Sequence, residues 1–459
     1  MKILLVRPIS NTYIISPPLG LGYIATALRK INVEPYILDC VKEGVSLKEF
    51  EGFLDKYNPE IVGFQVWSCD VYPVKESLKI VKKLNKNVVT IVGGAHPSGE
   101  LQRSLEYFKE ADFGFRGEGE EGVALLVKKL SGDDSIQFDS IPGLIWRDDG
   151  KIKLNSPVFV DNLDSLGIPA WDLMPPADYP EAPHQGFAKE FPIAPIITTR
   201  GCPFNCSFCA SHTINGRKVR FRTLDHVLEE ISLLRNEYGV KEIHIEDDNF
   251  TINKKFVQQF CRALIKNGNN IFWHCSSGIR VDSLDVDTFR LMKRSGCYTF
   301  TVAIESGSNR VLQLMQKQLT VETVRKQVAM MNRAGCKPTG LFMIGFPGEK
   351  RQEIEETIKF AKSLNLKRAQ FAIFHPMPGS RIYDELKNQG RLNCLDWSKI
   401  KPSEVAYATE IPEKELKRLQ RKAFLSFHLR PRILICQLME INSWKHFWYL
   451  LKRVFSMLF

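Results

Sequence analysis

Three cysteines at short spacing are the residues of this chain best suited to chemistry. Cys202, Cys206 and Cys209 lie in the run Thr-Thr-Arg-Gly-Cys-Pro-Phe-Asn-Cys-Ser-Phe-Cys, which follows an apolar stretch. Cysteine thiolates hold 4Fe–4S clusters, one per iron, so three thiolates leave one iron open to another ligand. A structural zinc site is closed by four protein ligands, and His212 is the one nearby candidate for a fourth. The spacing therefore predicts an iron–sulfur cluster with one open iron.

Charged residues follow several strand-like segments further along the chain. Glu246, Asp247 and Asp248 end the run Ile-His-Ile-Glu-Asp-Asp, and a carboxylate near the cluster could accept charge-assisted bonds from an ammonium group. The alternative is an acidic helix start that offsets the helix dipole. Arg280 could clamp a carboxylate, and Glu305 ends a later strand. A surface ion pair is the alternative for Arg280 and for Glu305.

The cysteines and these charges need a scaffold that brings strand ends together. Six strand-like segments alternate with helical patterns at 195–199, 242–246, 271–276, 298–305, 339–345 and 370–374. Six units are fewer than the eight of a closed barrel, so an open, partial (β/α)6 barrel is expected, with its chemistry at the carboxyl ends of the strands.

The N-terminal part predicts a separate α/β domain. Short β-branched runs at 3–6, 34–38, 61–66 and 88–92 alternate with amphipathic stretches, which is typical of a doubly wound, flavodoxin- or Rossmann-like sheet. A Pro-rich stretch follows and indicates a linker. The expected organisation is an N-terminal domain over 1–135, a linker over 136–190, a barrel over 191–380 and a helical C-terminal segment over 381–459.

The cysteine run resembles the signature of the radical S-adenosylmethionine (SAM) enzymes, with Phe208 as the aromatic residue before the last cysteine. In that family the open iron binds the amino and carboxylate groups of SAM, and the cluster delivers the electron that cleaves it. The resemblance implies that Glu246 contacts the amino group and that Gly345 lies against the adenine. The residues expected to contact SAM are Phe208, Glu246, Arg280, Glu305 and Gly345.

The N-terminal domain resembles a cobalamin-binding domain, whose fingerprint is Asp-x-His-x-x-Gly, then Ser-x-Leu, then Gly-Gly. Val41 stands where that fingerprint has its cobalt-ligating histidine, and Asp70 stands where it has leucine. An apolar side chain cannot coordinate cobalt, so cobalamin is expected without a lower histidine ligand. His96 is expected to cap the next helix or to line the pocket of the nucleotide tail. The residues implied for cobalamin binding are Gly20, Gly22, Asp39, Val41, Gly44, Ser68, Gly93, Gly94 and Glu118. A ligand-free scaffold is the alternative.

Together these resemblances imply a cobalamin-dependent radical SAM enzyme. The expected cofactors are a 4Fe–4S cluster, SAM and cobalamin, and the expected reaction is methylation of an unactivated carbon of a small or lipid-like substrate. An electron donor such as flavodoxin or ferredoxin is expected as a partner. One alternative is oxidative cyclisation or rearrangement without methyl transfer, as in the anaerobic porphyrin-ring cyclase. An alternative of another class is a cobalamin or iron–sulfur sensor, although no nucleic-acid-binding motif is recognisable.

Composition adds expectations about the compartment. The 11 cysteines show no paired spacing outside 202–209, which indicates a reducing cytoplasm. The net charge is +11, and residues 413–459 carry ten Lys or Arg against three Glu. An aromatic and basic helical pattern over 444–458 predicts a tail that packs over the barrel mouth or touches the inner face of the membrane.

Overall fold

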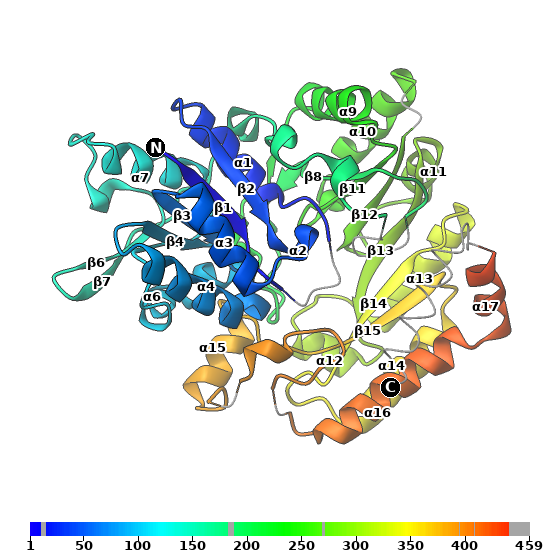
Figure 1. Ribbon diagram of the computed structural model, residues 1–459. Helices are drawn as coiled ribbons and strands as arrows, with labels where there is room; N and C mark the ends of the chain where they lie inside the picture. Colours follow the sequence, from blue (N-terminus) through cyan, green and yellow to red (C-terminus); the bar gives the residue numbers. More distant parts are fainter. Residues whose placement is uncertain (11–14, 182–187, 269–270, 394, 408, 440–459) are drawn as a thin grey trace. The chain divides into compact units, whose positions relative to one another are not determined.

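The computed structural model describes residues 1–10, 15–181, 188–268, 271–393, 395–407 and 409–439 (Figure 1). The chain forms two compact units. The first contains Met1–Phe204, Phe208–Asp248 and Met377–Arg391, and the second contains Asn205–Ser207, Asn249–Pro376 and the chain from Leu392 onward. The expected C-terminal helical pattern over 444–458 lies outside the described residues. No helix among the described residues is long and apolar enough to cross a membrane.

The first unit contains a seven-stranded sheet in the order β2-β1-β3-β4-β5-β6-β7. Its parallel strands are β1 (Ile3–Arg7), β2 (Pro35–Asp39), β3 (Ile61–Gln65), β4 (Val89–Gly93) and β5 (Phe113–Phe115). The antiparallel hairpin β6 (Leu144–Asp148) and β7 (Lys151–Leu154), from the expected linker, extends the same sheet. The strands read as continuous apolar runs because both faces of the sheet are covered.

Helices cover the two faces of this sheet in the way that a doubly wound fold requires (Figure 1). One face packs against α1 (Leu19–Arg29) and α7 (Glu120–Leu130), whose buried side chains share a core with the strands. The others are α2 (Cys40–Glu43), α3 (Leu47–Tyr57), α4 (Val71–Leu84), α5 (Ala95–Glu100) and α6 (Gln102–Tyr107). The order in which successive strands are added to the sheet reverses between β1 and β3, and ligands bind at such a switch point in doubly wound sheets.

The six strands expected for the partial barrel are present, in the order β15-β14-β13-β12-β11-β8. They are β8 (Ile193–Ile196), β11 (Glu242–Ile245), β12 (Phe272–Ile279), β13 (Cys297–Glu305), β14 (Thr339–Ile344) and β15 (Arg368–Ile373). β8 and β11 belong to the first unit, and the other four belong to the second. The connecting helices are α9 (Leu224–Tyr238), α10 (Lys254–Lys266), α11 (Val286–Arg294), α12 (Asn309–Leu314), α13 (Val321–Arg333) and α14 (Arg351–Ser363). The predicted fold class is confirmed.

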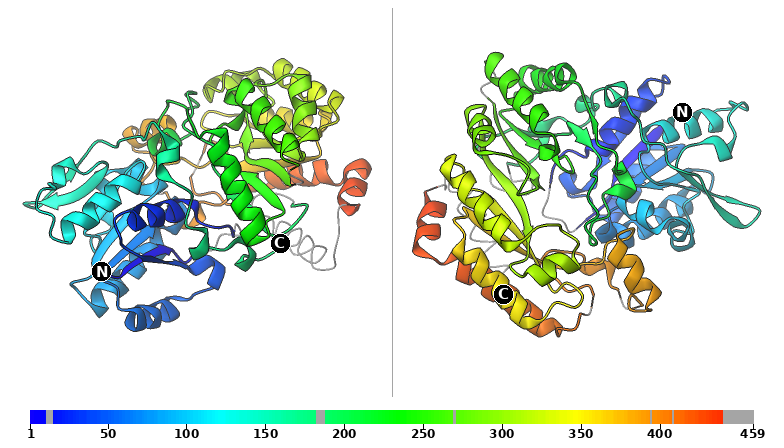
Figure 2. Two further views of the ribbon diagram at one scale, coloured as in Figure 1. Left: turned by 90° about the horizontal axis from the view of Figure 1, so that it is seen from above. Right: turned by 180° about the vertical axis from the view of Figure 1, so that it is seen from behind.

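The segment after the last barrel strand divides between the two units. Met377–Arg391, with α15 (Arg381–Asn388), packs on the N-terminal domain, where buried Tyr383 donates a hydrogen bond to Glu100. In the second unit, α16 (Glu413–His428) packs on β15 and α14 (Figure 2). The short helix α17 (Pro431–Leu438) follows it.

Candidate active site

The cysteine loop begins at a two-stranded hairpin formed by β9 (Thr199–Arg200) and β10 (Arg220–Phe221). Gly201 follows β9 with a φ of 96°, and a Cβ there would lie 2.3 Å from the Lys218 carbonyl oxygen. Only glycine fits that position without a shift of the backbone. The Cys202 N–H donates to the Gly216 carbonyl at 3.3 Å, and α8 (His212–Asn215) follows the loop. The side chains of the three cysteines are half-buried.

Two of the three predicted carboxylates hold the start of this loop. Buried Asp247 accepts hydrogen bonds from the Thr198 N–H at 2.7 Å and from the hydroxyls of Thr198 and Thr199 at 2.5 and 2.8 Å. Asp248 accepts from the Gly201 N–H at 3.1 Å and from the Asn215 side-chain amide at 2.9 Å. Burial raises the pKa of both carboxyls, and that of Asp247 reaches about 6. Asp247 and Asp248 therefore position the loop.

Glu246 is the first of the three carboxylates and lies just beyond the end of β11. It is half-buried, and its backbone N–H donates to the Ile196 carbonyl at 2.9 Å. Residue type and spacing did not decide which of the three carboxylates contacts SAM, and the family resemblance pointed to Glu246. Because Asp247 and Asp248 hold the backbone of the loop, Glu246 stays the predicted contact of the SAM amino group.

The middle of the cysteine loop, Asn205–Ser207, belongs to the second unit and is held by hydrogen bonds within it. The Ser207 N–H donates to the Met315 carbonyl at 2.9 Å, and the Ser207 hydroxyl donates to the Leu314 carbonyl at 3.2 Å. Arg280 forms a 2.7 Å ion pair with Asp282 and donates to two backbone carbonyls, those of Lys317 and Gln318. Arg280 therefore stabilises the segment whose carbonyl groups accept the hydrogen bonds from Ser207.

The glycine-containing turn after β14 is shaped by an acidic residue that sequence analysis missed. Gly345 has a φ of 77°, and its Cβ position would lie 2.8 Å from a methyl carbon of Leu416 in α16. Buried Glu349 accepts hydrogen bonds from the N–H groups of Gly345 at 2.6 Å and Phe346 at 3.1 Å. Burial raises the pKa of Glu349 to about 8. The acidic residue directly after Pro-Gly was the available sequence signal.

In the N-terminal domain, the carboxyl ends of β3 and β4 meet in a tight junction. The Val66 N–H donates to the Gly93 carbonyl at 2.7 Å, and the His96 N–H donates to the Val66 carbonyl at 3.0 Å. Gly94 has a φ of 104°, and its Cβ position would lie 3.2 Å from the Val66 carbonyl oxygen. The Ser68 hydroxyl lies 3.2 Å from Nδ1 of His96. His96 is therefore buried within the first turn of α5, where it packs on Ser68 and Phe108.

The structure places the first element of the cobalamin fingerprint after β2, the edge strand. One Asp39 oxygen accepts from the N–H groups of Val41 and Lys42, at 3.1 and 3.0 Å. The other pairs with Arg7 at 3.2 Å and accepts from the Tyr179 hydroxyl at 3.0 Å. Asp39 caps α2, and Gly44 ends α2 with a φ of 66°. These roles of Asp39 and Gly44 are structural. The end of β2 lies one strand away from the switch point between β1 and β3.

Two glycines that sequence analysis placed near the corrin lie inside helix α1. A Cβ on Gly22 would meet the Met174 side chain at 2.2 Å and Pro169 at 3.1 Å. Gly22 therefore permits close packing of α1 against the linker. The Cβ position of Gly20 makes one ordinary contact, 3.9 Å from the side-chain nitrogen of Gln65.

Glu118 belongs to a buried cluster of charges that connects the N-terminal domain to the hairpin carrying the cysteine loop. It pairs with Arg220 at 2.7 Å and with Arg200 at 3.2 Å, while Glu120 pairs with Arg200 at 2.7 Å. All four side chains are at least 92% buried. Two carboxylates thus compensate two guanidinium groups, which buried charges require. Sequence analysis did not identify Arg200 and Arg220 as partners of Glu118.

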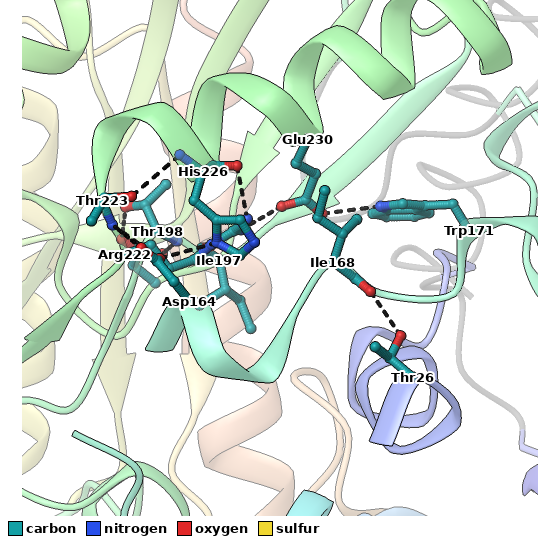
Figure 3. Close-up of polar contacts among 11 residues, drawn as sticks. Thr26, Asp164, Ile168, Trp171, Ile197, Thr198, Arg222, Thr223, His226 and Glu230 are labelled. Atoms are coloured by element: carbon teal, nitrogen blue, oxygen red, sulfur yellow. Dashed lines mark hydrogen bonds and ion pairs between the residues drawn. The ribbon is translucent and has the colours of Figure 1, made fainter. Parts of the chain in front are cut away.

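Figure 3 shows a second buried polar network, around Arg222 and Glu230. These two form an ion pair, and the Trp171 indole N–H donates to Glu230 at 3.0 Å. Asp164 accepts from the Thr223 N–H at 3.0 Å. Trp171 and Asp164 belong to the expected linker, so the linker is tied to α9 by a buried hydrogen bond at Glu230 and by a more exposed one at Thr223, the residue before the helix.

The side chains present fit the expected cofactors. Three half-buried thiols on one braced loop are the soft donors that an iron–sulfur cluster uses. In the N-terminal sheet, Gly94 lets the Val66 backbone approach closely and leaves no side chain of its own at the strand ends, and Val41 offers no metal ligand. Fold and site together define an α/β enzyme with one site for a metal cluster and another for a nucleotide-bearing cofactor.

Comparisons with known proteins agree with this definition. The Radical SAM superfamily model matches residues 196–361, and the B12 binding domain model matches residues 9–127. The chain is 34% identical to an uncharacterized methyltransferase of Pyrococcus horikoshii, over 99% of this chain and 97% of the relative. It is 30% identical to the cytidylyl-2-hydroxyethylphosphonate methyltransferase of Streptomyces wedmorensis, over 81% of this chain and 78% of the relative. The chain belongs to the cobalamin-dependent radical SAM enzymes.

A solved structure shows the same fold. The radical SAM methyltransferase TsrM of Kitasatospora setae, with cobalamin and a 4Fe–4S cluster bound, aligns with a TM-score of 0.68 at 19% identity. The alignment covers 84% of this chain and 75% of TsrM. This similarity supports the predicted fold class, in which an N-terminal α/β domain precedes a partial barrel.

Proposed function

We propose that this protein methylates a carbon atom of a small or lipid-like molecule. The observation that carries the proposal is the similarity to two methyltransferases that extends over 99% and 81% of this chain, and so through both domains. A further relative is the hopanoid C-3 methylase of Methylococcus capsulatus, which is 27% identical over 70% of this chain. These relatives are named for methyl transfer to chemically different substrates. They therefore support methyl transfer as the reaction and do not narrow the substrate to one chemical class.

When bound, the cluster supplies the electron that cleaves SAM, and cobalamin carries the methyl group. The residues of this chain hold the parts in place. Asp247 and Asp248 fix the start of the cysteine loop through Thr198 and Gly201. We propose that Glu246 binds the ammonium group of SAM and that Gly345 lies against its adenine. We also propose that the β3–β4 junction at Gly94 contacts cobalamin. A flavodoxin or ferredoxin is the proposed electron donor.

A second function is favoured by one comparison. The chain is 26% identical to the anaerobic magnesium-protoporphyrin IX monomethyl ester cyclase of Cereibacter sphaeroides, over 83% of this chain and 62% of the cyclase. A cyclase of this kind and a methyltransferase share the generation of a radical from SAM. They differ in whether SAM also gives up its methyl group.

The product balance of SAM separates these functions. We expect the anaerobically reconstituted protein, given SAM, a strong reductant and cobalamin, to release both 5′-deoxyadenosine and S-adenosylhomocysteine. Release of S-adenosylhomocysteine should stop when cobalamin is omitted, and Cys206→Ala should abolish 5′-deoxyadenosine. Release of 5′-deoxyadenosine alone would support the cyclase, and release of neither product would support a sensor.

A further inference from the structure

The turn between α12 and α13 carries a buried lysine that the assigned functions do not use. Lys317 is 7% exposed, and its Nζ lies 2.9 Å from Oε1 of Glu305, which is also buried. The flanking residues Gln316 and Gln318 have φ values of 51° and 54°, and Glu305 itself has a φ of 69°. Residues other than glycine rarely adopt a positive φ. They keep this backbone conformation only where surrounding contacts hold them in it.

The contacts that fix this turn also reach the cysteine loop. Arg280 donates to the carbonyls of Lys317 and Gln318 at 3.0 and 2.8 Å. The carbonyls of Leu314 and Met315, just before Lys317, accept the two hydrogen bonds from Ser207. Ser207 is the residue directly after Cys206, so a single turn supports the loop and presents the lysine beside it.

Cys206 lies close enough to Lys317 to interact with it electrostatically. Burial lowers the pKa of Lys317, but Glu305 and the nearby Cys206 outweigh burial, and the net shift is upward. The lysine is therefore an ammonium ion paired with a carboxylate, and it lies two residues beyond Met315, whose carbonyl accepts from the residue after Cys206. Charges inside a protein act more strongly than the same charges in water.

We propose that Lys317 tunes the reduction potential of the cluster held by the three cysteines, with Glu305 as the opposing charge. One electron from the external donor adds one negative charge to the cluster, and a fixed ammonium nearby stabilises that reduced form. The potential of an iron–sulfur cluster depends on the net charge around it and on hydrogen bonds to its sulfurs. Lys317 is thus a positioning and tuning residue rather than a catalytic one.

The inference rests on the cluster of the proposed function, although it does not depend on methyl transfer. The test is an anaerobic redox titration of the reconstituted full chain without SAM, followed by electron paramagnetic resonance, with iron counted in each sample. Lys317→Met keeps the length of the side chain and removes the charge, so its midpoint potential should become more negative. Glu305→Gln should shift the potential in the positive direction, and the double variant should fall between the two.

Two control variants separate charge from structure. Lys317→Arg keeps the charge and should stay near the wild-type potential, and Lys326→Met removes an exposed lysine on α13 and should change nothing. An unchanged potential in Lys317→Met at full iron content would overturn the proposal. If Lys317→Met binds no iron, Glu305→Gln still decides, because the absence of a positive shift there also overturns it. A wild-type chain that binds no iron would instead contradict the proposed function.

Discussion

Two pairs of parallel strands in the first unit, β3–β4 and β8–β11, hold their carboxyl ends together by different means. At the end of β3–β4, backbone bonds to backbone directly, because Gly94 allows an approach that a Cβ would obstruct. At the end of β8–β11, the carboxylates of Asp247 and Asp248 take up the N–H groups of Thr198 and Gly201.

The two means of holding the strand ends together match the different cofactors that we propose for the two ends. The glycine junction lets the two strand ends pack closely and leaves no side chain at Gly94, which is compatible with the cobalamin site that we propose there. The carboxylates brace a loop whose three thiols stay half-exposed and available to metal. The same parallel-strand geometry thus underlies both of the cofactor sites that we propose.

The largest expected effect is loss of the iron–sulfur cluster without loss of cobalamin binding. Cys206→Ala removes one of the three thiolates, so we expect loss of the cluster, from about four irons per chain to near zero, and loss of all SAM cleavage. Cobalamin binding to the N-terminal sheet should persist. Iron analysis and the visible absorption of bound cobalamin check both outcomes, with Cys436→Ser on α17 as the control. Loss of cobalamin together with iron would show that the two sites are not independent.

Acid should weaken the β3–β4 junction. Burial lowers the pKa of His96 from 6.5 to about 4, so the unfolded chain binds one more proton than the folded chain between these values. The free energy of unfolding should therefore fall by about 3 kcal/mol as the pH drops through this window. Urea unfolding at several pH values checks this, and His96→Gln should remove that part of the loss. An equal acid loss in the variant would assign the effect to other groups.

The carboxylate at the other end should have the opposite pH dependence. Burial raises the pKa of Asp247 from 3.8 to about 6, so the folded chain holds the extra proton between these values. Its contribution to stability is present below pH 3.8 and falls by about 3 kcal/mol as the pH rises through 6. Asp247→Asn should flatten this part of the stability profile of the cluster-free chain. A variant profile that keeps the wild-type slope would contradict the assignment.

The smallest expected effect tests the glycine junction itself. Gly94→Ala adds a Cβ at a φ of 104° and 3.2 Å from the Val66 carbonyl oxygen. We expect a loss of roughly 1–3 kcal/mol in stability and weaker cobalamin binding, measured by spectroscopic titration. The matched control is Gly52→Ala in α3, where nothing lies within 4 Å of the added Cβ. That change should stabilise the chain by roughly 0.5–1 kcal/mol and leave cobalamin binding unchanged.

Much of the fold could be predicted because it depends on local patterns. The apolar runs that became β1, β3, β4 and β8 are marked by neighbouring residues, and so is the loop that follows β8. The hairpin β6–β7 lies within the Pro-rich stretch that was expected to be a linker. Its addition to the edge of the N-terminal sheet depended on pairing with β5, which no local pattern specifies.

The site divides in the same way. The sequence by itself determined the three thiols and the run of three carboxylates, because their chemistry is read from residue type and spacing. The tertiary structure decided that Asp247 and Asp248 brace the loop, that Glu118 meets Arg220 102 positions away and that Lys317 faces Glu305. Hydrogen bonds and buried ion pairs join residues by distance in space, and only packing brings distant residues within that reach.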